Sequence, residues 1–319
     1  MRILRTLAIS IIACFSIFQG IAAYAAAWPE DRPITLVIPF SPGGSTDVVG
    51  RLLASNLSTL LKQSVIVDNR AGAGGTMGAA YAAHAKPDGY TLLLATTAHT
   101  IAPSVYDSLP YDFIKDFSPI TTIASLPHVL IVNSALPIES VADLIKYAGK
   151  HTGLNYGSAG IGSTDHLSME LFNRKAGIKM EHVPYKGDGP MMSDLISGHI
   201  QVGMPPSGVI IGSLKAHSVK ALAVSSAKPS VYFPGVPSIN EYLSGYTFKT
   251  MYALMVPAGT PEDVQTKLYQ AVLVALKSPD MKNMMQTISA EPGGESAKEL
   301  ARFISEQTQE WHNILKSGQ

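Results

Sequence analysis

Cysteine is almost absent from this chain, since Cys14 is the only one in 319 residues. It lies in an N-terminal segment that we expect to be removed, so the mature protein would contain none. A chain without cysteine has no disulfide, no thiol nucleophile and no cysteine-based metal site. Its fold must therefore rest on packing alone, and about 290 residues are enough for one or two domains.

An excess of charge of one sign is also absent. The chain has 24 basic and 24 acidic side chains. Removal of an N-terminal segment that contains Arg2 and Arg5 but no acid leaves 22 basic residues, and a net charge of about −2. Nucleic-acid-binding proteins normally carry a marked basic excess. We therefore expect no nucleic-acid partner.

Long apolar runs are missing after the N-terminus. Arg2 and Arg5 precede an apolar run over residues 7–21, and small residues suited to cleavage follow. This pattern is typical of a secretory signal peptide, and cleavage after Ala25 or after Ala27 fits it. The run is short for a membrane helix, which needs about 20 apolar residues. The sequence predicts a signal peptide at residues 1–27 and an exported, soluble mature protein.

Common catalytic and cofactor motifs are lacking as well. Tyr156 stands where a GxSxG nucleophile elbow needs glycine, and the nine histidines include no HExxH zinc motif. Gly72, Gly74 and Gly78 are spaced one residue too widely for a dinucleotide fingerprint, and no nucleotide-binding GKS or GKT sequence occurs. We expect no enzymatic reaction, no cofactor and no metal site.

The chain does contain a strand, a tight glycine loop and a helix near its start. Residues 34–38 are apolar and β-branched, as in a buried strand, and apolar residues recur at helical spacing over 48–61. Between them, residues 39–47 hold two adjacent glycines. The first amides of such a helix can bind an anion, whereas the simpler alternative is a cap by Thr46 or Asp47. The candidate ligand contacts in this loop are Phe40, Ser41, Gly43, Gly44 and Asp47.

Two further strands are expected at residues 64–68 and 91–95, and the second one ends in polar residues. Ligand sites of α/β proteins gather at such strand ends. Thr97 and His99 are therefore candidates. His99 can hydrogen-bond a carboxylate, although a structural role is the favoured alternative.

The second half of the chain repeats this arrangement. A short strand at 154–156 leads into a loop of glycines and hydroxyls at 157–165, and a helix follows. Ser158, Gly162 and Ser163 are the candidates in this loop. Further on, Tyr185 and Lys186 lie between a proline and a glycine, where Lys186 can offer a positive charge or remain a solvated loop lysine.

Taken in order, these segments resemble the receptors of tripartite tricarboxylate transporters, the Bug-type periplasmic solute-binding proteins. The resemblance covers nearly all of the mature chain. Each piece alone is weak, whereas the ordered set is specific. The matching pieces are Pro42-Gly43-Gly44 with Asp47, Asn69 with Gly72-Ala73-Gly74-Gly75, Pro87-Asp88-Gly89-Tyr90, Leu109-Pro110-Tyr111-Asp112, Tyr156-Gly157-Ser158-Ala159-Gly160 with His166, Val183-Pro184-Tyr185-Lys186-Gly187, Gly235-Val236-Pro237-Ser238, and Val256-Pro257-Ala258-Gly259-Thr260-Pro261.

The resemblance implies an α/β fold of two lobes, like a type II periplasmic binding protein. Each lobe would hold a mixed, mostly parallel sheet flanked by helices, with the ligand cleft between the lobes and a hinge of two crossing strands. Alternating strand and helix patterns agree with this fold. We expect residues 28–124 and 226–319 to form the first lobe and residues 125–225 the second.

The resemblance also implies a function. Family members capture small carboxylates in the periplasm, and a membrane transporter or a sensor then reads the occupied receptor. The two glycine loops would face each other across the cleft, so that two helix N-termini favour a negatively charged ligand. We expect a monomer that binds an organic acid. A neutral or amide ligand stays open, because no cleft arginine can be named.

One departure from the family bears on the ligand. Many members carry Phe-Asp-Asn where this chain has Met204-Pro205-Pro206. The missing acid weakens the case for an amino-bearing ligand, and the two prolines stiffen the segment. Pro205 is the candidate contact there.

Overall fold

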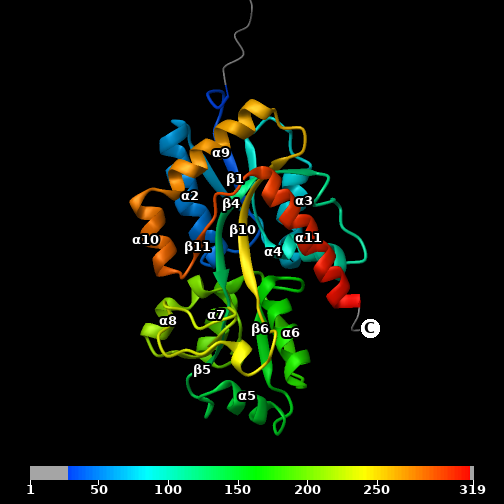
Figure 1. The fold of residues 1–319 in the computed structure, drawn as a ribbon, viewed down its shortest axis with the longest axis vertical. Coiled ribbons are helices and arrows are strands. Elements are labelled where there is room, and N and C mark those ends of the chain that lie inside the picture. Colours follow the sequence, from blue (N-terminus) through cyan, green and yellow to red (C-terminus); the bar gives the residue numbers. More distant parts are fainter. Residues whose placement is uncertain (1–27, 317–319) are drawn as a thin grey trace, which may run out of the picture.

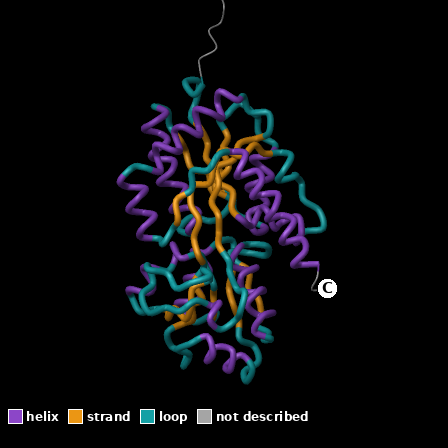
Figure 2. The backbone as a smooth tube through the Cα atoms, viewed as in Figure 1, coloured by secondary structure: helices purple, strands orange, loops and turns teal. Residues whose placement is uncertain are grey.

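The computed structural model describes residues 28–316, so the expected signal peptide at 1–27 lies outside the described residues. Over these described residues, the chain forms one sheet of six strands and one of five. The two sheets lie one above the other along the long axis of the molecule, and helices surround each of them (Figures 1 and 2). This is the expected two-lobed α/β architecture.

The first sheet has the order β11-β4-β10-β3-β1-β2. Strands β2, β1 and β3 pair in parallel, whereas β10 pairs antiparallel with both β3 and β4, and β11 pairs antiparallel with β4. Its strands are β1 (Ile34–Ile38), β2 (Val65–Asn69), β3 (Thr91–Thr96), β4 (Phe117–Pro127), β10 (Lys249–Pro257) and β11 (Glu291–Pro292).

Helices cover both faces of the first sheet, which explains why β1 is apolar along nearly all of its length. Leu36 packs with Leu53 of α2 and Leu268 of α9, while its neighbour Val37 belongs to the cluster on the other face with Leu300 of α11. The helices of this lobe are α2 (Ser45–Leu61), η1 (Ala73–Gly75), α3 (Thr76–Ala83), α4 (Thr97–Val105), α9 (Glu262–Leu276), α10 (Pro279–Thr287) and α11 (Ala297–Lys316).

The second sheet has the order β7-β6-β8-β5-β9 and is also covered on both faces. Tyr156 and Phe172 lie in one hydrophobic cluster, and Met191 and Leu195 lie in another. Its strands are β5 (Val129–Asn133), β6 (Asn155–Ser158), β7 (Glu181–Pro184), β8 (Val202–Gly203) and β9 (Val219–Val224). Its helices are α5 (Val141–Ala148), α6 (Thr164–Ala176), α7 (Asp188–Ser197), η2 (Ser207–Val209), α8 (Ile211–Lys215) and η3 (Ile239–Glu241).

Parallel pairing is confined to one side of each sheet. In the second sheet β7, β6 and β8 are parallel, while β5 pairs antiparallel with β8 and β9. Both sheets are thus mixed as expected, but the expectation that they are mostly parallel is wrong, because antiparallel pairings are at least as many as parallel ones in each. The antiparallel part consists largely of the strands that enter or leave through the other lobe.

The lobes are joined where β4 leads into β5 and where the chain returns from β9 to β10. Strands β4 and β10 lie side by side as a long antiparallel pair (Figure 1). Residues 226–248, which connect β9 to β10, pack on the second lobe, because Phe233, Ile239 and Tyr246 belong to its hydrophobic clusters. We therefore propose that these residues go with the second lobe rather than with the first.

His128 joins the two crossing segments at the hinge. Its Nδ1–H donates to the Met204 carbonyl at 2.6 Å, and its Nε2 accepts from the Thr250 hydroxyl at 2.6 Å. Its backbone N–H donates to Ser225 Oγ at 2.7 Å, and Ser225 Oγ donates to the Phe248 carbonyl at 2.6 Å. Burial lowers the pKa of His128 to about 4, so the ring is neutral at pH 7.

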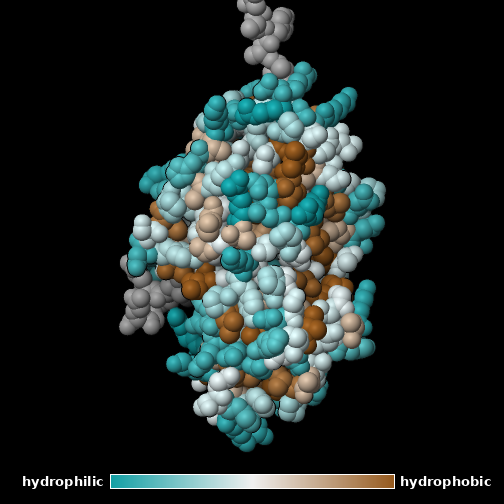
Figure 3. All heavy atoms as spheres, turned by 180° about the vertical axis from the view of Figure 1, so that it is seen from behind, coloured by the Kyte–Doolittle hydropathy of each residue, from teal (hydrophilic) through white to brown (hydrophobic). Residues whose placement is uncertain are grey.

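The outer surface alternates between polar and apolar patches on the face seen from behind (Figure 3). Among residues 28–316, no helix has the length and hydropathy needed to span a bilayer.

The hydrogen bond between His128 and Thr250 at the hinge should contribute to the stability of the folded protein. Thr250→Val leaves the buried Nε2 of His128 without its donor, which should lower the free energy of unfolding by about 1–3 kcal/mol. Urea denaturation measures the change, and Thr247→Val is the matched control because Thr247 is exposed nearby on the same segment. An equal loss in both variants would contradict the assigned role of Thr250.

Candidate functional site

Three helices begin where the two lobes meet. Helix α2 follows the loop at 39–44, α6 follows the loop at 159–163, and α7 follows the loop at 185–187. The N-caps of α2 and α7 are Gly44 and Gly187, and neither has a side chain to accept a bond from the first turn. Only α6 is capped by its own residue, Ser163, whose hydroxyl accepts the His166 N–H.

Asp47 is the anchor of the first loop. Its carboxylate accepts the Gly43 N–H at 3.0 Å, Arg51 Nε–H at 2.9 Å and Asn69 Nδ2–H at 2.9 Å. Burial acts to raise the pKa of Asp47, but the hydrogen bonds from Arg51, Gly43 and Asn69 outweigh it and lower the pKa. Asp47 therefore holds the loop in shape, and its carboxylate already has three donors.

Asp165 plays the same part in the second loop. Its carboxylate accepts the Ala159 N–H at 2.5 Å, and Ser158 Oγ both donates to the Gly160 carbonyl and accepts the Gly160 N–H. Burial raises the pKa of Asp165 to about 6. Each lobe thus folds a glycine loop back onto an acid in the first turn of the following helix.

The loops of the two lobes are in direct contact, so the structure is a closed conformation. Ser41 Oγ donates to the Lys186 carbonyl at 2.8 Å, and Tyr106 Oη donates to the Ile161 carbonyl at 2.6 Å. Gly74 approaches the second lobe so closely that a Cβ there would lie 2.3 Å from the Ile161 oxygen. A glycine is required at this approach.

Phe40 and the segment after β3 are the other parts of the first lobe that lie at the boundary between the lobes. Phe40 forms a small buried apolar cluster with Ala98 of its own lobe and Ala159 of the other. The Thr97 hydroxyl accepts the Met251 N–H at 2.9 Å and so joins α4 to β10.

His99 has a structural role. It is fully buried, its Nδ1 accepts the Thr96 N–H at 3.0 Å in a capping box, and its Nε2 lies 3.3 Å from the Gly75 carbonyl. Burial lowers its pKa to about 4. Because both ring nitrogens are engaged by the backbone, we remove His99 from the proposed ligand contacts.

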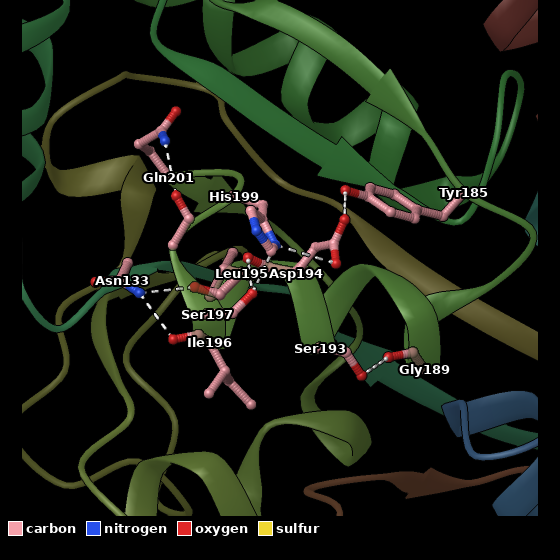
Figure 4. A network of polar contacts seen from close by, with 11 residues as sticks. Asn133, Tyr185, Gly189, Ser193, Asp194, Leu195, Ile196, Ser197, His199 and Gln201 are labelled. Atoms are coloured by element: carbon pink, nitrogen blue, oxygen red, sulfur yellow. Dashed lines mark hydrogen bonds and ion pairs between the residues drawn. The ribbon is translucent and has the colours of Figure 1, made fainter.

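The remaining candidates from the sequence lie in the second lobe, in its loops or at the hinge. Tyr185 Oη donates to Oδ2 of Asp194 in α7 at 2.6 Å (Figure 4). Lys186 is exposed and contacts Ser41 through its carbonyl oxygen. A Cβ at Gly162 would lie 3.0 Å from the Tyr106 ring. Pro205 is buried at the hinge, where its carbonyl accepts the Val129 N–H at 3.0 Å. Pro205 thus lies beside the crossing strands rather than in a glycine loop.

Sequence analysis did not single out Asp188, which lies at the centre of this arrangement. It is the first residue of α7, yet its Oδ2 lies 3.1 Å from the point where Gly44 of the other lobe would carry a Cβ. Burial, and then the charge of Asp165, raise the pKa of Asp188 well above its usual range, while a backbone hydrogen bond from Ser45 lowers it. The only signal in the sequence was an acid directly after a loop glycine, which is also an ordinary helix start.

The raised pKa of Asp188 predicts the pH dependence of one variant. The folded protein keeps a proton there that the unfolded chain loses above about pH 4, so stability falls as pH rises through the folded pKa. Asp188→Asn removes a group that at pH 7.5 must either keep its proton or be buried as an anion, so it should raise Tm by roughly 2–12 °C at pH 7.5, and by less at pH 4.5.

Thermal unfolding of both variants at both pH values checks this expectation. Asp280→Asn is the control, because Asp280 is an exposed acid in the first turn of α10. A lower Tm for Asp188→Asn than for the parent protein at pH 7.5 would show that the charge of Asp188 is compensated.

Comparison with known proteins shows the family to which the chain belongs. A family model described as "Tripartite tricarboxylate transporter family receptor" matches residues 49–319. Protein BugT of Bordetella pertussis is 32% identical, with 97% of this chain and 96% of that protein covered. A solved structure of R. palustris Rpa4515 with adipate is 37% identical, has a TM-score of 0.87 and covers 91% of this chain and 97% of its own.

A second solved structure, MatC from Rhodopseudomonas palustris with bound malate, is 30% identical with a TM-score of 0.86, and 90% of this chain and 99% of that one are covered. These likenesses confirm the expected two-lobed fold. The chain therefore belongs to the tripartite tricarboxylate transporter receptor family of solute-binding proteins.

Proposed function

We propose that this protein is a periplasmic receptor that captures a small organic acid between its lobes and presents it to a membrane transporter of the tripartite tricarboxylate type. No reaction is part of this function. The structures of two relatives are described with adipate and with bound malate, which are both dicarboxylates. A mono- or dicarboxylate is accordingly the expected ligand class.

The observation that carries the proposal is the meeting of three helix N-termini from both lobes. Helix α2 comes from the first lobe, and α6 and α7 come from the second. Each N-terminus favours a negative group by about 0.3–2 kcal/mol. The N-cap glycines of α2 and α7 provide no side-chain cap, although Asp188 comes to the start of α2 in this closed form. A ligand that touches both lobes favours the closed form over the open one.

Export to the periplasm rests on the signal peptide pattern at residues 1–27 and on family membership. The transporter partner rests on family membership alone. A sensor that reads the same closed form is the alternative partner, and loss of uptake in a strain that lacks the receptor separates the two.

A thermal-shift screen of the mature protein tests the ligand class. A ligand at about 100 times its Kd adds roughly 2.7 kcal/mol to stability, which corresponds to several degrees in Tm for a chain of this size. We expect shifts with mono- or dicarboxylates. Shifts confined to amides or sugars would contradict a carboxylate receptor.

Closure can be blocked at Gly44. Its φ of −84° suits any residue, but a Cβ would lie 3.1 Å from Asp188 Oδ2, and the branches of valine need still more room. Gly44→Val should therefore raise Kd at least ~10-fold while the fold survives. Isothermal titration calorimetry with the carboxylate found in the screen measures the affinity.

Gly212→Val is the matched control for this variant. Gly212 lies in α8, and a Cβ there meets no atom within 4 Å. Unchanged affinity in Gly44→Val would mean that the ligand does not need the approach of the two lobes at this point.

A further inference from the structure

A groove that contains no residue of the glycine loops lies beside the hinge. It consists of two cavities of about 450 and 550 Å³ that share the side chain of Tyr232. The first cavity is lined mainly by α9, α10 and the segment through β11, and the second by residues 226–232 together with the ends of β4 and β10 at the hinge. Helix α10 and β11 lie next to the boundary between the lobes (Figure 1). The walls of the groove therefore come from both lobes.

The first cavity is mostly apolar. The Tyr232 ring at its junction with the second cavity is 44% exposed. Ligand pockets commonly have this size and an apolar lining with a few polar groups, so the cavity suits the apolar body of a small ligand. Its apolar wall residues are Leu273, Leu276, Met285, Ala290 and Pro292.

Lysine predominates among the charged residues of the groove. Lys277 and Lys282 line the first cavity. Lys228 and Lys249 line the second, together with Glu291, the only acid among the described residues of either lining. Both carboxylate oxygens of Glu291 are already bonded to Lys249 Nζ, at 2.8 and 2.7 Å. Among residues 28–316, the other three lysines form no ion pair, so the charge of the groove favours an anion.

One buried hydroxyl in the wall of the second cavity has no acceptor. Ser289 is 3% exposed, and its Oγ lacks a hydrogen-bond partner among the described residues. The preceding residue is fixed by the other lobe, because the Ile288 carbonyl accepts the Ser207 hydroxyl at 2.5 Å. Buried polar atoms are normally paired, and a carboxylate can accept the hydrogen bond that a serine hydroxyl donates.

We propose that this groove is a second ligand site, which takes a small amphipathic carboxylate such as a medium-chain fatty acid. The apolar chain lies in the first cavity, and the carboxylate reaches past Tyr232 into the second. There Ser289 donates a hydrogen bond to it, and Lys228 supplies a positive charge. The groove shares no residue with the glycine loops, so this inference does not depend on the proposed function.

Three probes with the same chain and different head groups test the ligand class: octanoate, 1-octanol and octylamine. Isothermal titration calorimetry at pH 7.5 uses mature protein whose inter-lobe site is saturated with the carboxylate found in the screen. Octanoate should bind at least ~5-fold more tightly than 1-octanol, because the unpaired lysines favour an anion. Octylamine should bind more weakly than either.

Two variants locate the site. Lys228→Glu combined with Lys282→Glu reverses one charge in each cavity and should raise the Kd of octanoate at least ~10-fold. Lys86→Glu combined with Lys150→Glu is the matched control, because these lysines are exposed, line neither cavity and change the net charge equally. Ser289→Ala should raise the Kd of octanoate about 3–10-fold. It should not lower Tm, since the hydroxyl has no partner to lose.

The outcomes separate this inference from the proposed function. If octanoate no longer binds once the inter-lobe site is saturated, it occupies that site, and the second site is overturned. If 1-octanol binds as tightly as octanoate, or if Lys228→Glu with Lys282→Glu binds octanoate as tightly as its control, the assigned ligand class is overturned. If the screen finds no carboxylate for the inter-lobe site, the proposed function fails, while titration of the unliganded protein with octanoate still tests the groove. Octanoate that binds there, and that the paired lysine variant weakens, supports the second site by itself.

Discussion

The first-turn amides of three helices need hydrogen-bond acceptors at the boundary between the lobes. The arrangement of the two lobes depends on how these acceptors are supplied. Helix α6 is satisfied by its own Ser163. Helix α2 begins at Gly44 without a side-chain cap, and a carboxyl group from the other lobe, Asp188, comes to its N-terminus instead. An element of secondary structure in one lobe is thus completed only when the other lobe is close, which couples local hydrogen bonding to closure.

The hinge allows this coupling because the crossing strands are firmly hydrogen-bonded to each other, while the rest of the two lobes can separate. Strands β4 and β10 form a long antiparallel ladder with two register shifts. His128, with Ser225 and Thr250, joins the segments where the chain enters the second lobe. Away from the hinge, the lobes are joined by hydrogen bonds such as those of the Ser41 N–H and hydroxyl to the Lys186 carbonyl and that of Tyr106 to Ile161. Net contributions of about 0.5–1.5 kcal/mol per bond are small enough for a ligand to outweigh or to supplement.

Buried groups without partners carry a cost in the closed form. An unpaired buried polar atom costs about 1–3 kcal/mol, and Asp188 Oδ1 is one at the boundary between the lobes. The contrast with Asp47, whose carboxylate has three donors, separates the acid that shapes a loop from the acid that is left open.

The sequence by itself determined the local elements, because their signals are local. The apolar run at 34–38 became β1, with Leu36 and Val37 in clusters on opposite faces, and the paired glycines after it became the loop before α2. The roles of His99 and Asp188 were decided only by the tertiary structure. Whether a histidine binds a ligand or caps a helix depends on burial and on Gly75 and Thr96 around it. In the sequence, Asp188 has only the features of an ordinary helix start. Its burial and its raised pKa arise because Gly44 of the other lobe lies against it in the folded protein, and such effects depend on the surroundings and not on the residue alone.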